Sequence, residues 1–192
     1  MWSRTHRLTR KALILAAGLA VLGGTAALAV NVGFTDARTD SRAVIVVAHG
    51  AIHLSNSRAG KALLVGLNMK PGGSVQGTVK IGARGKTKLQ MTLRKGRLLE
   101  EAGQAGGRLS QRLILKVEWL RTGKKAPKVV YLGVLGKMRI VKLGTFKPNE
   151  RRTYRLTAYF PDGGPAVGTT GDNAYMGADL TVEFDWWGRA VK

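Results

Sequence analysis

The sequence predicts an all-β fold, an antiparallel β-sandwich of jelly-roll type with a short helical turn or loop insertion. Three observations support this: apolar and polar residues alternate over several short segments, Gly- and Pro-rich turns separate those segments, and helical periodicity is scarce. Several short strands with such turns between them are typical of sandwiches and jelly rolls. Because the 192 residues include no cysteine, packing and sheet hydrogen bonds alone must stabilise the fold.

The first 29 residues predict a signal peptide. A basic region without acids comes first: Arg4, Arg7, Arg10 and Lys11. The apolar stretch 12–27 follows, and the small residues around Leu28 fit the pattern that signal peptidase cleaves. The alternative is an uncleaved membrane anchor, since residues 12–30 are almost long enough to span a bilayer. Their richness in Ala and Gly favours cleavage near Ala29, which gives residues 1–29 as signal peptide, 30–42 as N-terminal strand and linker, and 43–192 as sandwich.

The charge balance is strongly basic. The chain has 32 Lys and Arg against 11 Asp and Glu, a formal net charge of +21. Removal of residues 1–29 leaves 28 basic and 11 acidic groups, a net charge of +17. Such a surface attracts extracellular DNA, acidic polysaccharide, cell-wall polymers or anionic headgroups. The alternative is that the charge only keeps a secreted protein soluble.

Alternation along the chain predicts five half-buried strands. Their inward faces are Val75, Gly77, Val79 and Ile81; Leu89, Met91 and Leu93; Leu113, Leu115, Val117 and Trp119; Tyr154, Leu156, Ala158 and Phe160; and Ala178, Leu180, Val182, Phe184 and Trp186. The wholly apolar residues 43–48 predict a strand covered on both faces. The Gly-rich residues 96–110 predict a surface loop with one helical turn, and the basic residues 123–128 predict a hairpin tip.

Turn residues mark the ends of these strands. In the turn that begins at Lys70, Pro71 fixes φ at the second position and Gly72 supplies a positive φ at the third, which predicts type II geometry. Asn173 is expected to take a left-handed conformation in a later turn, because Asn tolerates that region.

We predict no enzyme, no cofactor, and neither catalytic nor metal-binding residues. His49 and His53 are four residues apart, but in a strand this spacing corresponds to about 13 Å, too far for one metal ion. No Glu follows His49, as the HExxH zinc motif requires. The sequence also has no cysteine nucleophile and no GxSxG motif.

Much of the acid lies near the C-terminus, at Asp162, Asp172, Asp179, Glu183 and Asp185. The last three alternate with apolar residues and should lie on the solvent face of the last strand. Cross-strand pairing with Arg151, Arg152 or Arg155 is the expectation for them. For the loops around Asp162 and Asp172, a calcium site stays open as an alternative, because hard cations favour oxygen-rich turns.

Several fragments together carry a resemblance to a known family. In chain order they are Phe-Thr-Asp at 34–36, Gly-Ala-Ile-His-Leu-Ser at 50–55, Met-Lys-Pro-Gly-Gly-Ser-Val at 69–75, the turn at 143–154, Phe-Pro-Asp at 160–162 and Gly-Asp-Asn-Ala-Tyr-Met-Gly-Ala at 171–178. They resemble the TasA/camelysin family of secreted fibre proteins, in the family's order.

This resemblance implies a jelly-roll-like sandwich that is exported and polymerises into matrix or cell-surface fibres. It also implies that the mature N-terminus serves as a donor strand in the next subunit. The turns that carry the resemblance include Lys70, Pro71, Gly72, Asp172, Asn173 and Tyr175. Some relatives are labelled metalloendopeptidases, but this sequence lacks a protease pattern.

The new N-terminus fits the donor role. Val30, Val32 and Phe34 share one face of a short strand, and the polar residues 36–42 follow as a linker. A strand this short needs a sheet to pair with, and a groove on a neighbouring copy would supply one. The alternatives are a strand that folds back onto its own sandwich and a frayed tail.

The expected function is therefore that of a secreted structural subunit, with itself and anionic polymers as partners and signal peptidase acting during export. A monomeric, basic polyanion-binding or adhesion module is the first alternative. A camelysin-type metalloendopeptidase is the second. The expected location is the extracellular matrix or the cell surface.

Overall fold

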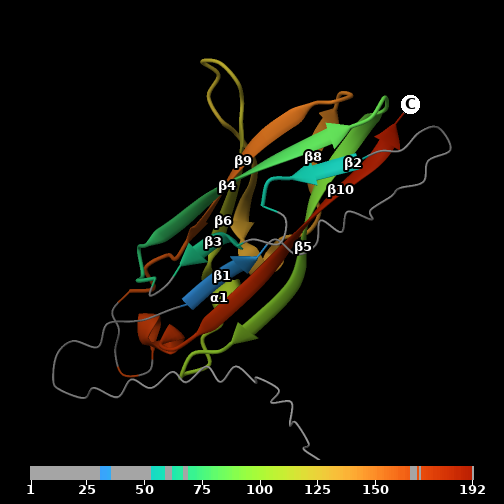
Figure 1. Cartoon of the computed structure of the whole chain (residues 1–192). Helices are drawn as coiled ribbons and strands as arrows, with labels where there is room; N and C mark the ends of the chain where they lie inside the picture. The colour runs from blue at the N-terminus through green and yellow to red at the C-terminus, as the bar shows by residue number, and fades with distance from the viewer. Residues whose placement is uncertain are drawn as a thin grey trace, which may run out of the picture.

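Two β-sheets facing each other form the described part of the chain (Figure 1), which confirms the predicted all-β sandwich. The structure, a computed structural model, describes residues 31–35, 53–58, 62–66, 69–164, 168 and 170–191. The strands are β1 (Asn31–Thr35), β2 (His53–Asn56), β3 (Ala62–Gly66), β4 (Ser74–Arg84), β5 (Lys88–Glu101), β6 (Ile114–Leu120), β7 (Lys128–Val134), β8 (Val141–Phe146), β9 (Arg151–Tyr159) and β10 (Asp179–Val191). The short helices are α1 (Leu109–Arg112), η1 (Leu135–Lys137) and η2 (Gly171–Tyr175).

Each sheet has five strands. Sheet A has the order β3-β1-β10-β5-β8, and sheet B has the order β2-β4-β9-β6-β7. Among the described strands, β1 and β10 are parallel and every other neighbouring pair is antiparallel. The β6–β7 connection, which includes the predicted basic hairpin tip, projects from one end of the sandwich (Figure 1).

The core lies between the sheets and is made of the residues that alternation selects. All inward-facing residues predicted for the five strands are buried or half-buried. Tyr154, Phe160 and Phe184 are among the largest side chains that are fully buried. Each such side chain contributes about 1.5–3 kcal/mol when it is removed from water. Because this core is continuous, one sandwich accounts for the described residues from β4 onward.

The prediction of a loop at residues 96–110 is wrong for its first half. Strand β5 continues through Gly96 to Glu101, paired with β10. The β5–β10 register shifts between Val182 and Phe184, which lie opposite Leu98 and Lys95, so β5 has an extra residue at this point. Pairing with a long neighbouring strand outweighs the low intrinsic preference of Gly96 for a strand. A short helix, α1, begins at Leu109, at the very end of the predicted segment, and continues to Arg112 beyond it. The Glu100 carboxylate accepts hydrogen bonds from the N–H and hydroxyl of Ser110 at 2.6 and 2.8 Å.

Several sequence predictions lie outside the described residues. These are the signal peptide with its cleavage site, Val30, the apolar segment 43–48 and His49. Within the described ranges, no helix is both long enough and apolar enough to cross a membrane.

Candidate assembly site and its supporting clusters

The N-terminal strand β1 lies inside sheet A, between β3 and β10 (Figure 1). On one side Val32 and Phe34 are paired in register with Gly66 and Leu64 of β3, and on the other side β1 runs parallel to β10. Backbone hydrogen bonds therefore hold this five-residue strand along both edges. This arrangement corresponds to the alternative given above, in which the strand folds back onto its own sandwich instead of pairing with another copy.

The turn at Lys70 has the predicted geometry. Gly72 has a φ of 79°, and the N–H of Gly73 donates to the Lys70 carbonyl at 2.9 Å, as a type II turn requires. The same turn is fixed to the end of β9. The Gly72 N–H donates to the Phe160 carbonyl at 2.7 Å, and the Phe160 N–H donates to the Gly73 carbonyl at 2.9 Å. Two fragments that lie far apart in the sequence therefore meet here.

The fragment at 171–178 joins them. The rings of Phe160 and Tyr175 meet edge to face with centroids 5.5 Å apart. The prediction for Asn173 is wrong, since among the described non-glycine residues Asn149 alone has a positive φ, at 60°. Asn173 instead lies in η2 and donates from its amide to the Gly168 carbonyl at 2.8 Å. The left-handed positions around η2 are Gly171 and Gly177, which have no side chain to clash there.

Asp172 holds the loop after β9 against η2. The residue is 5% exposed, and its carboxylate accepts a hydrogen bond from the Gly163 N–H at 2.8 Å. Burial raises the pKa of Asp172, and the neighbouring Asp162 adds to the rise, whereas the Gly163 N–H and Arg112 oppose it. Asp162 accepts the Gly164 N–H at 2.9 Å. The two carboxylates considered for calcium therefore lie together, but each is engaged by loop amides.

Two substitutions at Asp172 separate its acceptor role from its charge. Asp172→Ala leaves the Gly163 N–H without its partner, and we expect the free energy of unfolding to fall by about 1–3 kcal/mol. Asp172→Asn keeps an acceptor and removes the buried charge, so its stability at neutral pH should equal or exceed that of the wild type. Urea unfolding of both variants measures this difference. If both variants lost the same free energy of unfolding, the acceptor role and the charge of Asp172 could not be distinguished in this way.

The pH dependence of the same loop follows from the raised pKa. The wild-type carboxyl favours folding fully below its ordinary pKa of 3.8, and that benefit is lost as the pH rises through the higher pKa of the folded state. The uncharged Asp172→Asn variant has no such loss. We therefore expect the advantage of Asp172→Asn over the wild type to shrink as the solution is acidified.

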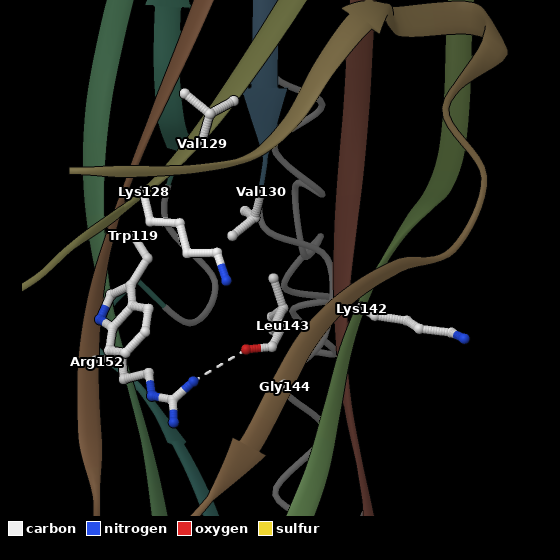
Figure 2. Close-up of a pocket in the computed structure, with 8 residues that line it drawn as sticks. All are labelled: Trp119, Lys128, Val129, Val130, Lys142, Leu143, Gly144 and Arg152. Atoms are coloured by element: carbon white, nitrogen blue, oxygen red, sulfur yellow. Dashed lines mark hydrogen bonds between the residues drawn. The ribbon is translucent and has the colours of Figure 1, made fainter.

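Arg152 joins the two sheets at the edge where β7 and β8 lie (Figure 2). Its guanidinium donates to the carbonyls of Leu143 and Thr145 on β8, at 3.0 and 2.6 Å, and to Glu150 at 2.6 Å. The same group lies 4.2 Å from the ring centroids of both Trp119 and Phe146. Two hydrogen bonds, an ion pair and two cation–π contacts thus converge on one side chain that is 9% exposed.

A cavity of about 360 Å³ lies beside this guanidinium. Residues from four strands line it, among them Trp119 of β6, Lys128 of β7, Leu143 of β8 and Arg152 of β9. Figure 2 shows Arg152 directed toward Leu143, whereas Lys142 points away from both. Burial alone would raise the pKa of Glu150, but hydrogen bonds from Arg152 and from the Lys147 N–H hold this pKa below its usual value. The described lining contains no carboxylate and combines apolar side chains with Arg152, Lys128 and Lys142.

The predicted partners of the C-terminal acids are wrong. Strand β10 pairs with β5 and β1 rather than β9, so the β9 arginines do not face its carboxylates. Asp185 has Arg94 of β5 as its register partner. Arg155 instead binds the buried Glu118 of β6 at 2.9 Å, and Lys116 reaches the same carboxylate at 2.8 Å. Burial opposes ionisation of Glu118, but these two cations lower its pKa overall.

The two histidines considered for metal binding are not brought together by the described residues. His53 begins β2 at the edge of sheet B, and His49 lies outside the described ranges. Within those ranges, no three His, Asp or Glu residues are grouped closely enough to hold a metal ion. Comparison with known protein-family models and with curated proteins finds no match.

Sequence reasoning missed the role of Arg152, although a signal for its position was present. Tyr154, Leu156 and Ala158 face the core at every second position, and Arg152 continues the same parity. A cation on an inward face must find buried partners. Glu150, directly before β9, is one such partner, but the others are on β8 and β6, which the local sequence of β9 does not reveal.

Proposed function

We propose that this protein is a secreted structural subunit that polymerises into extracellular matrix or cell-surface fibres by exchanging strand β1 between copies. The observation that carries the proposal is the place of β1. A strand at the start of the expected mature chain is inserted into the middle of a sheet, and it has parallel and antiparallel neighbours. Without β1, the facing edges of β3 and β10 would need another strand to satisfy their hydrogen bonds.

The order of the other strands supports the view that β1 is an addition to a jelly roll. With β1 and β2 left aside, sheet A has the order 3-10-5-8 and sheet B has the order 4-9-6-7. Two interlocked Greek keys give this alternation of strands between sheets. In this arrangement β3 and β10 are the first and last strands, and β1 occupies the gap between them.

The connection after β1 is long enough for exchange. Residues 36–52 join β1 to β2, and the predicted linker within them, the seven residues 36–42, spans at most about 25 Å when extended. In strand exchange, β1 makes the same contacts with a neighbouring copy that it makes within its own chain. Exchange is therefore a low-cost route to association. A short linker keeps β1 near its own sandwich at an effective concentration in the millimolar range, and a neighbouring copy must compete with this. Added contacts between subunits or a high local concentration would therefore favour fibres.

Negative-stain electron microscopy of the purified secreted protein tests the proposal. We expect fibres from the wild type, and folded protein without fibres after deletion of residues 30–35. Val32→Asp combined with Phe34→Asp should act in the same way with the backbone retained. Val32→Ile with Phe34→Leu is the matched control and should preserve assembly, because it keeps the apolar character of both positions. Fibres of normal length from the deletion variant would refute strand exchange.

The monomeric polyanion-binding module is a second candidate, and one observation favours it. The basic charge is accompanied by an exposed tryptophan between arginines and a lysine on sheet A. A protein that stays monomeric at every concentration tested and still binds polyanions would support this candidate over the fibre subunit.

A further inference from the structure

The outer face of sheet A presents a tryptophan among basic side chains. Trp187 of β10 is 47% exposed, and the guanidinium of Arg94 lies 5.0 Å from its ring centroid. A cavity of about 450 Å³ adjoins the indole. Its polar and aromatic lining comes from three strands: Gln90, Thr92, Arg94, Lys142, Trp187 and Arg189.

Strand register fixes the spacing of these side chains. Thr92 of β5 is paired with Trp187 on one side and with Lys142 of β8 on the other. Directly opposed residues are about 5 Å apart, and diagonal neighbours are about 7–8 Å apart. Arg94 occupies a position diagonal to Trp187 and lies against its ring. Arg189 lies one same-face step beyond Trp187, and Lys142 lies two strands away from it across Thr92.

The acid near this surface lies to one side of it. Asp185 is the register partner of Arg94 and offsets part of its charge. No Asp or Glu is among the residues that line the cavity. Arg189 donates to the side-chain oxygen of Gln90 at 3.2 Å, an uncharged partner that leaves the positive charge in place. The surface around the indole therefore attracts anions.

We propose that this face binds single-stranded nucleic acid, with a base stacked on Trp187 and phosphates contacting Arg94, Lys142 and Arg189. Aromatic side chains beside a cationic groove are the usual platform for unpaired bases, and every base can stack. Arg94 can support the stacked base as well, because guanidinium planes also stack on bases. This binding needs only the folded sandwich, so it is independent of strand exchange.

An acidic polysaccharide is disfavoured by the polar groups present. A sugar site orients hydroxyl groups with fixed polar groups of its own. Here the described lining offers two uncharged polar side chains, Gln90 and Thr92, and the Gln90 oxygen already accepts from Arg189. The lining therefore binds mainly through the face of the indole and through positive charge. A nucleotide uses both, because its base can stack on the ring and its phosphate can contact the cations.

Fluorescence anisotropy with two labelled strands of equal length tests the proposal. One strand is oligothymidylate, and the other has abasic sites in place of every base, so it has the same phosphates and nothing to stack. Trp187→Ala should weaken oligothymidylate binding by about 5- to 150-fold and leave abasic-strand binding unchanged. Trp187→Phe retains a ring and should retain most of the affinity.

A charge-matched pair of variants tests the phosphate contacts. Lys142→Ala with Arg189→Ala should reduce the slope of log affinity against log salt by about 1.4, at about 0.7 per phosphate on a single strand. Lys124→Ala with Lys125→Ala removes the same charge at the β6–β7 tip, outside the cavity lining, and should change the slope less. Circular dichroism checks that each variant is folded.

Three results would overturn the proposal. They are an equal loss with Trp187→Ala on both strands, no loss on either, and a loss for a polyuronate without a loss for oligothymidylate. If Trp187→Ala does not fold, tryptophan fluorescence decides. Oligothymidylate, but not the abasic strand, should quench the wild type, and the quenching should be lost in Trp187→Leu.

Discussion

Replacing Arg152 with alanine is expected to lower the free energy of unfolding by about 3–5 kcal/mol, because it breaks a largely buried ion pair and removes one of its partners. Glu150 loses its cation, and the carbonyls of Leu143 and Thr145 lose their donor. The rings of Trp119 and Phe146 also lose the group between them. All of these contacts lie where the edges of the two sheets meet, so the loss should open that edge.

Two further variants make this expectation specific. Arg152→Lys keeps the charge but not the planar fork, so it can serve fewer acceptors at once, and we expect a loss of about 1–3 kcal/mol. Arg151→Ala removes an exposed neighbour of the same charge and should stay within about 0.5 kcal/mol of the wild type. Urea unfolding in dilute solution gives all three values. A stability of Arg152→Ala equal to that of Arg151→Ala would show that the edge is held by other contacts.

Acid should weaken the same contact. The folded-state pKa of Glu150 lies below its ordinary value of 4.5. The stability that comes from its ionised form is therefore complete above 4.5 and is lost as the pH falls through the folded-state pKa. Arg152→Ala removes the main cause of the lowered pKa, so its stability should depend less on pH in this range.

The strands and their inward faces could be predicted because alternation is a local property. Val79, Met91 and Leu115 are buried for the reason that the sequence shows, namely an apolar residue at every second position. The type II turn at Gly72 is also local, since Pro and Gly restrict their own dihedral angles. These features need no knowledge of which strands become neighbours.

The predictions are wrong where the structure depends on which strands become neighbours. Residues 96–101 begin with Gly96 and include three charged side chains, yet pairing with β10 makes them strand. The sequence predicts an arginine of β9 as the partner of Asp185, but the topology places Arg94 beside it. Arg152 has inward parity, but its role depends on β8. Pairing between distant strands is non-local, and short-range patterns do not specify it.

The pairing partner of the N-terminal strand β1 also cannot be predicted from its local sequence. Its amphipathic pattern predicts a strand that needs a sheet, and β1 is such a strand. Whether β1 pairs within its own chain or with another copy depends on linker length, concentration and contacts between subunits. The local sequence of β1 contains none of these quantities.

An engineered pair of cysteines distinguishes the two states of β1 directly. Gly33 of β1 and Val65 of β3 are register partners in the antiparallel pair, where Cα atoms lie about 4.5–5.5 Å apart. This distance is within the range that a disulfide spans. Because the chain has no cysteine of its own, Gly33→Cys with Val65→Cys can form one disulfide within a chain or the same disulfide between chains.

We expect the oxidised double variant to migrate as a monomer on a non-reducing gel when it is oxidised in dilute solution, since the cis strand then carries the bond. The locked monomer should form no fibres, and reduction should restore assembly. When fibres of the reduced variant are oxidised after assembly, strand exchange places each bond between neighbouring subunits, so the gel should show a ladder of covalent oligomers. Each single-cysteine variant controls for random cross-links and should give at most dimers. Fibres whose oxidised subunits still migrate as monomers would show that β1 stays in its own sandwich and that assembly uses another surface.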